Sequence, residues 1–369
     1  MTRVLRMIED VGFLSNKRMA LEVGIGLAHL SGRTLSLPVD APVGWGPRPA
    51  LEGAAAGRAS SLRDLYDLPV AIMGDHEYAE LLAEHPVRSV DWPDLHTAVF
   101  VDPPEQADGS DFVAFAHGRP AIGFDPVWAE DPILDVAARG LGFYSYLFYL
   151  APERRRELFT VLERVRAKQP YVDLARDLAA DLGPFNAAHI RRTDSLIGVP
   201  QSRAVSPWMI RDNLASVFPA EERLVVCTEA DPGSDVFVPL RAHFDDVVFL
   251  SGAVLETRSW HDRFDELPTH DDSALALVTQ EVAARAERFA GTFASTFTAV
   301  IHRQRRLADP RAPFLFTADF LGGGTRFDAC EYHPVEQGPY SWNRLGYPVD
   351  PAVLSWMREW PEVVVSPTR

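Results

Sequence analysis

The first forty residues alternate strand-like and helix-like patterns, and this alternation limits the fold more than any other feature of the sequence. Residues 4–8 are a short apolar run, and between residues 19 and 30 apolar side chains recur every three to four positions, as on one face of a helix. Gly32 can end that helix, and residues 33–38 form a second strand-like run. A strand, a helix and another strand in this order are typical of a parallel sheet, so the sequence predicts an α/β fold.

The second half repeats this alternation, which indicates a second α/β unit. Strand-like runs such as residues 223–228 alternate with helical patterns, and the clearest helix spans residues 273–289, with Ser273 as its N-cap. A chain of 369 residues is also too long for one ordinary core. We therefore expect two Rossmann-like domains, residues 1–170 and 171–369, with one substrate-binding cleft between them.

Three stretches favour connections over regular elements. Residues 39–60 are rich in Pro, Gly and Ala and predict an extended loop, and residues 169–183 predict a bridge to the strand at His189, which places the domain boundary near residue 170. Residues 251–272 predict a polar loop that contains Trp260. We interpret the first and the last of these loops as candidate walls of a groove for an acceptor substrate.

The charge balance excludes several classes of partner. The chain carries 36 basic and 52 acidic residues, for a net charge of −16. Such a chain is not expected to bind nucleic acid or an anionic membrane non-specifically. All cations except Lys17 and Lys168 are arginines, which is typical of a GC-rich bacterial genome. Any anion-binding site must therefore be a local concentration of arginine within an acidic protein.

Targeting and redox signals are weak in this sequence. The first residues lack the apolar core of a signal peptide, and no run approaches the ~18 uncharged apolar residues of a membrane span. Cys227 and Cys330 have no CxxC flanks, so neither a disulfide framework nor a cysteine metal site is expected. We expect a cytoplasmic protein that does not contact the membrane.

Two adjacent arginines just past the midpoint are the strongest chemical signal. Arg191 and Arg192 follow a short apolar strand, with His189 before them and Asp194 after them. A planar guanidinium donates two parallel hydrogen bonds to phosphate oxygens, so such a pair at a strand end can grip a doubly charged oxyanion. The alternative is an exposed pair on a surface turn, because arginine is usually exposed.

A second anion-binding signal lies about one hundred residues later. Residues 291–298 form a loop of small side chains that opens a helix, with Ser295 and Thr296 at its start. Helix N-termini hold phosphate through backbone N–H groups and the positive end of the helix dipole. An ordinary N-cap is the alternative for these two hydroxyls.

Metal-binding patterns are less convincing. Glu229 and Asp231 follow a strand and could imitate an Asp-x-Asp metal site, but acidic caps after strands are also common. The histidines at positions 243, 261, 270 and 302 show no metal-ligand spacing. We therefore expect no metal ion.

Three blocks of sequence carry a resemblance to a known family. Residues 12–16 with residues 32–38 resemble its opening block, and residues 189–194 are similar to its H-x-R-R-T-D motif. Residues 274–302 resemble its F-x-G-x-x-x-S-T-F block. In these blocks the chain resembles the fucosyltransferase superfamily, which includes the protein O-fucosyltransferases, the α-1,6-fucosyltransferases and the nodulation fucosyltransferases.

This resemblance implies a fold and a reaction. The fold is GT-B, in which two Rossmann-like domains face a central cleft and the C-terminal domain holds most of the nucleotide sugar. The reaction is a metal-independent, inverting transfer of fucose from GDP-fucose, which is a donor substrate and not a cofactor. A fixed guanidinium fits that chemistry, since it can neutralise a departing diphosphate where other enzymes use Mg²⁺.

The resemblance also implies roles for individual residues. Arg191 would bind the β-phosphate and stabilise the charge on departing GDP. Arg192 and Asp194 would support the loop, and His189 would lie beside the nucleotide. The remaining positions implied to contact the donor are Ser295, Thr296 and Phe297 from the third block and Gly12 and Asn16 from the first.

Two departures from the family pattern leave alternatives open. Thr279 stands where the family has a guanine-recognising Asp, so a UDP- or dTDP-sugar donor stays open. The family's catalytic Glu has no counterpart at Gly198 and Val199, and the nearest acids in the first block are Glu9 and Asp10. We take Asp10 as the candidate general base, with a simple capping role as its alternative.

The acceptor cannot be chosen from the sequence. The hydroxyl of a glycan, a small molecule or a protein would each suit the predicted transfer. A non-catalytic nucleotide- or glycan-binding protein is a further hypothesis, because no general base is identified with the family motif.

Overall fold

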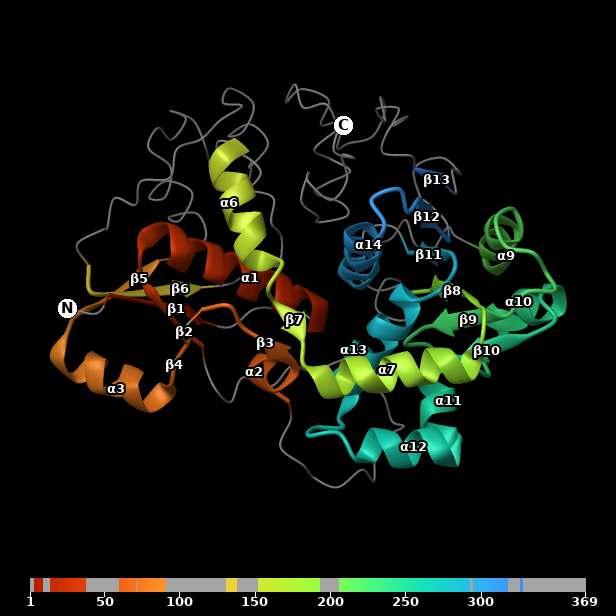
Figure 1. Ribbon diagram of the computed structural model, residues 1–369, viewed down its shortest axis with the longest axis horizontal. Helices are drawn as coiled ribbons and strands as arrows, with labels where there is room; N and C mark the ends of the chain where they lie inside the picture. The colour runs from red at the N-terminus through yellow and green to blue at the C-terminus, as the bar shows by residue number, and fades with distance from the viewer. Residues whose placement is uncertain are drawn as a thin grey trace. The chain divides into compact units, whose positions relative to one another are not determined.

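The computed structural model describes residues 3–8, 14–37, 60–70, 72–90, 131–137, 152–192, 206–292, 295–317 and 326–327. These residues belong to two compact units, and along the described chain the first unit ends at Ala167 and the second begins at Lys168. Each unit contains a sheet of mostly parallel strands (Figure 1).

The first unit is built on a five-stranded parallel sheet with strand order β4-β2-β1-β6-β5. Val4 of β1 and Ile133 of β6 pack on Tyr78 of α3, while α1 and α6 lie on the other side of the sheet (Figure 1). A sheet covered on both faces is the usual setting of parallel strands. The elements of this unit are β1 (Val4–Ile8), α1 (Leu14–Ser31), β2 (Thr34–Ser36), α2 (Leu62–Leu65), β3 (Tyr66–Asp67), β4 (Ile72–Met73), α3 (Asp75–Glu84), β5 (Val87–Val90), β6 (Ile133–Ala137), α6 (Pro152–Leu162) and β7 (Arg166–Ala167).

The second unit is built on a six-stranded sheet with strand order β10-β9-β8-β11-β12-β13. All neighbouring strands in it are parallel except β12 and β13. The elements of this unit are α7 (Gln169–Leu182), β8 (Asn186–His189), α9 (Pro207–Ala215), β9 (Leu224–Cys227), a 3₁₀ turn (Asp235–Phe237), α10 (Val238–His243), β10 (Val247–Phe249), α11 (Leu250–Glu256), α12 (Arg258–Asp265), α13 (Asp272–Ala284), β11 (Phe289–Gly291), α14 (Thr296–Ala308), β12 (Phe314–Phe316) and β13 (Arg326–Phe327).

The central strands of the second unit are buried on both faces. Every residue of β8 and β9 is buried. Ile210 and Leu214 of α9 and Leu240 of α10 pack with Ala188, Val226 and neighbouring strand residues on one face. Helix α13 is buried from Ser273 to Ala283 and lies against α7 and α14. Strands buried on both faces read as continuous apolar runs, which is why β9 was easy to predict.

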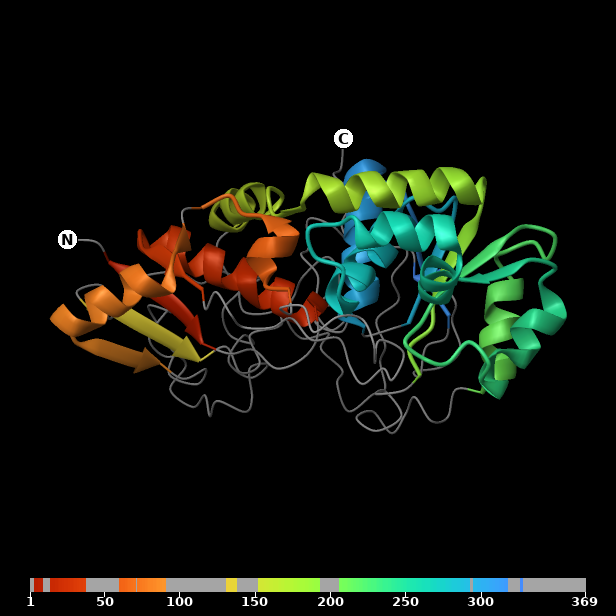
Figure 2. The same cartoon turned by 90° about the horizontal axis from the view of Figure 1, so that it is seen from below.

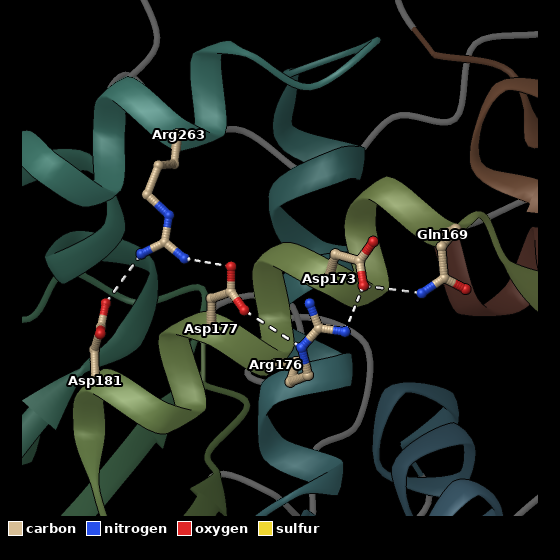
Figure 3. A network of polar contacts seen from close by, with 6 residues as sticks. All are labelled: Gln169, Asp173, Arg176, Asp177, Asp181 and Arg263. Carbon is tan, nitrogen blue, oxygen red and sulfur yellow. Dashed lines mark hydrogen bonds and ion pairs between the residues drawn. The ribbon is translucent and has the colours of Figure 1, made fainter.

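Helix α12 is attached to α7 through charged side chains. The Arg263 guanidinium reaches Asp177 at 2.9 Å and Asp181 at 3.0 Å, and the Trp260 indole N–H donates to Asp181 at 3.1 Å. Figure 3 shows Arg263 directed at Asp177 and Asp181, one turn apart on α7. Arg176 in turn bridges Asp177 and Asp173. Exposed pairs of this kind contribute about 1 kcal/mol or less each. The network therefore orients α12 more than it stabilises the fold.

The structure confirms the predicted α/β class and corrects several local predictions. Residues 169–183 are not a bridge, because they contain the amphipathic helix α7, and the predicted polar loop at residues 251–272 contains helices α11 and α12 (Figure 2). The N-cap of α13 is Asp271 rather than Ser273, since the Asp271 carboxylate accepts from the backbone amides of Ser273 and Ala274. Residues 39–59 lie outside the described residues.

The predicted role of the Trp260 segment in an acceptor groove is not supported. Trp260 contacts Asp181, near the C-terminal end of α7 and only five positions before β8 begins. It therefore lies toward the amino-terminal edge of the sheet, whereas ligands in such folds bind at the carboxyl edge.

Within the described part of the chain, no helix is long and apolar enough to cross a membrane. The expected cytoplasmic location stays a prediction.

Candidate functional site

The carboxyl edge of the second sheet contains a point at which the chain changes direction. From β8 the chain adds β9 and β10 on one side, and it then crosses to add β11 and β12 on the other. In open α/β sheets, ligands bind outside the carboxyl ends of the strands at such a switch point. Here the switch point lies between the ends of β8 and β11, at His189 and Gly291.

Arg191 leaves β8 at this switch point and is held by a residue that follows β11. The Arg191 backbone N–H donates to the Thr292 hydroxyl at 3.0 Å, and the same hydroxyl donates to the His189 carbonyl at 2.9 Å. Ile190, between them, is buried, and its N–H donates to the Cys227 carbonyl of β9 at 2.9 Å. The backbone that carries the Arg191 side chain is thus fixed from both neighbouring strands.

Arg192 is held from the opposite side, by β9. Its backbone N–H donates to the Glu229 carboxylate in a short hydrogen bond. Burial lowers the pKa of the Arg192 guanidinium, and the negative charge of Glu229 acts in the opposite direction. Arginine nevertheless stays charged at physiological pH. Two guanidinium groups therefore begin at adjacent, fixed positions on one sheet edge.

His189 links the end of β8 to the first turn of α14. Its Nδ1 lies 2.8 Å from the Thr298 hydroxyl, and its ring is tilted against the Phe297 ring with 4.6 Å between centroids. Gly291 makes room for this contact, because a Cβ atom there would lie 2.2 Å from Cγ2 of Thr298. Strand β11 therefore needs glycine at this position for α14 to approach His189.

The N-terminus of α14 points into the same region. Helix α14 has 13 residues and begins at Thr296, after the switch-point strand. Among the residues that the structure describes, the N-cap Ser295 makes no side-chain capping hydrogen bond. A helix start that is not capped by its own side chain, next to two arginines, is the combination that a phosphate group requires.

The structure thus gathers most of the predicted residues of the second unit at one edge. His189, Arg191, Arg192 and the first turn of α14 with Ser295, Thr296 and Phe297 come together through the contacts above. Asn16 lies in the first turn of α1 in the other unit and is half-buried. Three predicted residues, Asp10, Gly12 and Asp194, lie outside the described residues.

Thr292 is a site residue that the sequence patterns did not indicate, and for Glu229 they left a metal site and an acidic cap as alternatives. The Glu229 carboxylate bonds to the Arg192 amide, while Asp231 accepts from the Gly233 amide at 2.9 Å within its own turn. These two acids therefore have separate structural roles. In the described part of the chain, no group of three His, Cys, Asp or Glu side chains is placed to hold a metal ion. Thr292 carried a signal, since it directly follows Gly291 in the third block.

Thr279 does not line the site in this structure. It lies in the middle of α13 with 0 % of its surface exposed, and its hydroxyl finds no hydrogen-bond partner among the described residues. A side chain that no ligand can reach cannot select a donor base. Thr279 therefore does not contact a donor base in this structure, and the choice among GDP-, UDP- and dTDP-sugars stays a prediction.

His302 lies behind the site, on the buried face of α14, and gives a prediction about stability. Burial and the nearby positive charge of Arg305 lower its pKa to about 3, although a hydrogen bond with the Leu315 backbone acts the other way. Below the ordinary pKa near 6.5, the unfolded chain binds a proton at this histidine that the folded chain does not. The contribution of neutral, buried His302 to the free energy of unfolding is therefore complete above pH 6.5 and decreases as the pH falls toward 3.

We expect this histidine alone to lower the free energy of unfolding by about 2 kcal/mol between pH 8 and pH 5. Urea unfolding of the wild type and of His302→Gln at both pH values measures it, and the variant should lose that part of the pH dependence. His76→Gln, at an exposed position, is the control and should keep it. Equal pH dependence in wild type and His302→Gln would contradict the prediction.

Comparisons with known proteins agree with the resemblance seen in the sequence. No family model matches the chain. Human GDP-fucose protein O-fucosyltransferase 2 is 24 % identical over 155 residues, which are 41 % of this chain and 34 % of that protein. The match thus spans about a third of the length of the curated relative.

The solved structures that the chain resembles are fucosyltransferases. NodZ α-1,6-fucosyltransferase soaked with GDP-fucose has 15 % identity and a TM-score of 0.45, with 85 % of this chain and 95 % of that chain covered. POFUT1 in complex with GDP has 13 % identity and a TM-score of 0.49, covering 83 % and 95 %. A mutant of Arabidopsis thaliana FUT1 in complex with GDP has 10 % identity and a TM-score of 0.46, covering 86 % and 70 %.

Proposed function

We propose that this chain is an inverting, metal-independent glycosyltransferase that moves fucose from GDP-fucose to a hydroxyl group of a glycan, a small molecule or a protein. The single observation that carries the proposal is the placement of Arg191. It leaves the central strand at the switch point, with its backbone fixed by Thr292, beside the N-terminus of α14. This arrangement suits a diphosphate.

The chemistry follows from that placement. The acceptor oxygen forms a bond to C1 of the sugar while the bond from C1 to the β-phosphate oxygen breaks, and GDP departs with the bonding electrons. Attack from the face opposite the leaving group inverts the configuration at C1. Arg191 and the α14 dipole would stabilise the charge that grows on the departing diphosphate.

The acceptor proton needs a base. We propose Asp10, which follows the end of β1 by two residues in the sequence. Strand β1 is the central strand of the first unit, and its carboxyl end is the position at which an α/β sheet presents catalytic residues. A carboxylate there would accept the proton as the acceptor oxygen attacks.

GDP-fucose is preferred as the donor because of the sequence blocks and because the curated relative is named for that donor. The described residues also favour a diphosphate without favouring a metal, since the positive groups at the edge are guanidinium groups and a helix N-terminus. We propose that the two domains have the roles that the resemblance implies. Residues 1–170 would lie on the acceptor side, and residues 171–369 would bind the nucleotide sugar.

A panel of nucleotides tests the donor assignment. At ligand concentrations about 100 times Kd, GDP and GDP-fucose should raise the Tm by about 5–10 °C. UDP, dTDP and their sugars should raise it much less. Differential scanning fluorimetry measures these shifts, with Arg191→Ala as the control that loses them. A larger shift with UDP or dTDP would assign a different donor to the same fold.

A further inference from the structure

Thr292 makes two hydrogen bonds to backbone atoms that lie on either side of one residue. Its hydroxyl donates to the His189 carbonyl at 2.9 Å and accepts from the Arg191 N–H at 3.0 Å. Ile190 lies between these two groups and is 1 % exposed. A single hydroxyl thus bridges the segment that turns out of β8 and carries the first arginine.

The bridge stands where the sheet itself stops. The register between β8 and β11 ends with Ala188 opposite Ala290. Beyond that pair the two backbones no longer pair with each other as strands, and the His189 carbonyl and Arg191 N–H would lack a β11 partner. The Thr292 hydroxyl supplies both an acceptor and a donor there, so it extends the hydrogen bonding of the ladder past the last paired residues.

The hydroxyl is occupied by this role. A threonine hydroxyl has one proton to donate, and Thr292 donates it to His189. It therefore has no proton for a phosphate oxygen, which separates it from a ligand-binding hydroxyl. Its influence on a ligand must pass through the backbone that it holds.

We propose that Thr292 is a positioning residue, whose hydroxyl sets the backbone from which the Arg191 guanidinium reaches the leaving diphosphate. The proposal rests on the proposed function and adds a residue to its mechanism. A guanidinium held in place before the reaction stabilises developing charge without reorganisation, whereas a displaced one loses much of that effect.

A second contact to this segment supports a positioning role for side chains around Arg191. Glu229, at the end of β9, accepts from the next amide along, the Arg192 N–H. The two consecutive arginines are therefore held through their backbone amides by side chains that follow the two strands flanking β8.

Three variants at one position test the proposal. Thr292→Val keeps the shape but removes the hydroxyl, and it leaves the Arg191 N–H and the His189 carbonyl without this partner. We expect kcat with GDP-fucose to fall by about 100-fold, with a smaller change in KM. Thr292→Ser restores the hydroxyl and should recover most of the activity. Thr292→Ala serves as a second hydroxyl-free variant if Thr292→Val does not fold.

Thr269→Val is the matched control. It removes a hydroxyl that lies 2.7 Å from the Tyr171 hydroxyl in the same unit and makes no contact with Arg191 in the structure. Its kcat and KM should match those of the wild type, even if its Tm is lower. If Thr292 were only structural, Thr292→Val would resemble Thr269→Val, with a lower Tm and unchanged kcat and KM per folded molecule. That result would overturn the proposal.

Amide hydrogen exchange separates this inference from the proposed function. In Thr292→Val the Arg191 amide should exchange faster than in the wild type and in Thr292→Ser. An unchanged exchange rate at Arg191 overturns the positioning role, whatever the donor. Wild-type protein that neither binds nor consumes GDP-fucose counts instead against the proposed function, while faster exchange in the variant still supports the backbone role of Thr292.

Discussion

Arg191→Ala is expected to lower kcat for transfer from GDP-fucose by about 100- to 1,000-fold, the usual cost of removing one group that stabilises a developing oxyanion. The fold should survive, because the backbone N–H that bonds to Thr292 is kept in alanine. Initial rates of GDP release, with the Tm recorded in parallel, measure both effects.

Two further variants sharpen this prediction. Arg191→Lys keeps a positive charge but loses the planar, two-pronged donor, so it should recover only part of the activity. Arg176→Ala is the matched control, because it removes an arginine of the same unit whose ion pairs with Asp173 and Asp177 are exposed (Figure 3). Arg191→Ala with the same kcat as Arg176→Ala would refute the assignment of Arg191.

Gly291→Ala is expected to damage both stability and activity. The added Cβ would lie 2.2 Å from Cγ2 and 2.5 Å from Oγ1 of Thr298, so the first turn of α14 must shift. Overpacking of this kind costs about 1–3 kcal/mol. The same shift would separate Thr298 from His189 and move the helix N-terminus away from the arginines. Urea unfolding and donor turnover measure the two losses.

A double variant tests whether Thr298 is the cause. Thr298→Ala removes the two closest atoms, so Gly291→Ala should cost less stability in that background than in the wild type. Gly252→Ala in α11 is the control, because its Cβ would meet no atom closer than 3.8 Å and alanine favours the helix. Additive losses in the double variant would show that the crowding at Gly291 has another source.

The fold class was predictable because strand runs such as residues 224–227 and the βαβ opening are local patterns. Helix α7 was also visible in principle. Its buried residues Tyr171, Leu174, Leu178 and Leu182 have helical spacing, although the stretch lies at the domain boundary, where a connecting segment is equally expected. Helix α12 was harder, since it is short and only Phe264 of its residues is buried, while polar contacts to α7 help to attach it.

The site was predictable to the extent that it depends on sequence order. A pair of arginines after a strand, and a loop of small residues that opens a helix, predict an oxyanion site without any coordinates. The support of that site was not predictable. Thr292 and Arg191 are 101 positions apart, and a hydroxyl bonded to a backbone amide has no periodic signature in the sequence. Counting positions also places Thr279 where the family has a guanine-recognising Asp, but it gives no sign that this residue is completely buried.

If the edge around Arg191 binds the diphosphate of GDP-fucose for transfer, the purified protein should consume this donor. The protein is incubated with GDP-fucose, and separately with UDP- and dTDP-sugars, and each donor is followed by mass spectrometry. We expect loss of GDP-fucose, with release of GDP and free or transferred fucose, and a loss at least 100 times slower in Arg191→Ala. GDP-fucose that stays intact while another nucleotide sugar is consumed, or that binds without being consumed, would contradict it.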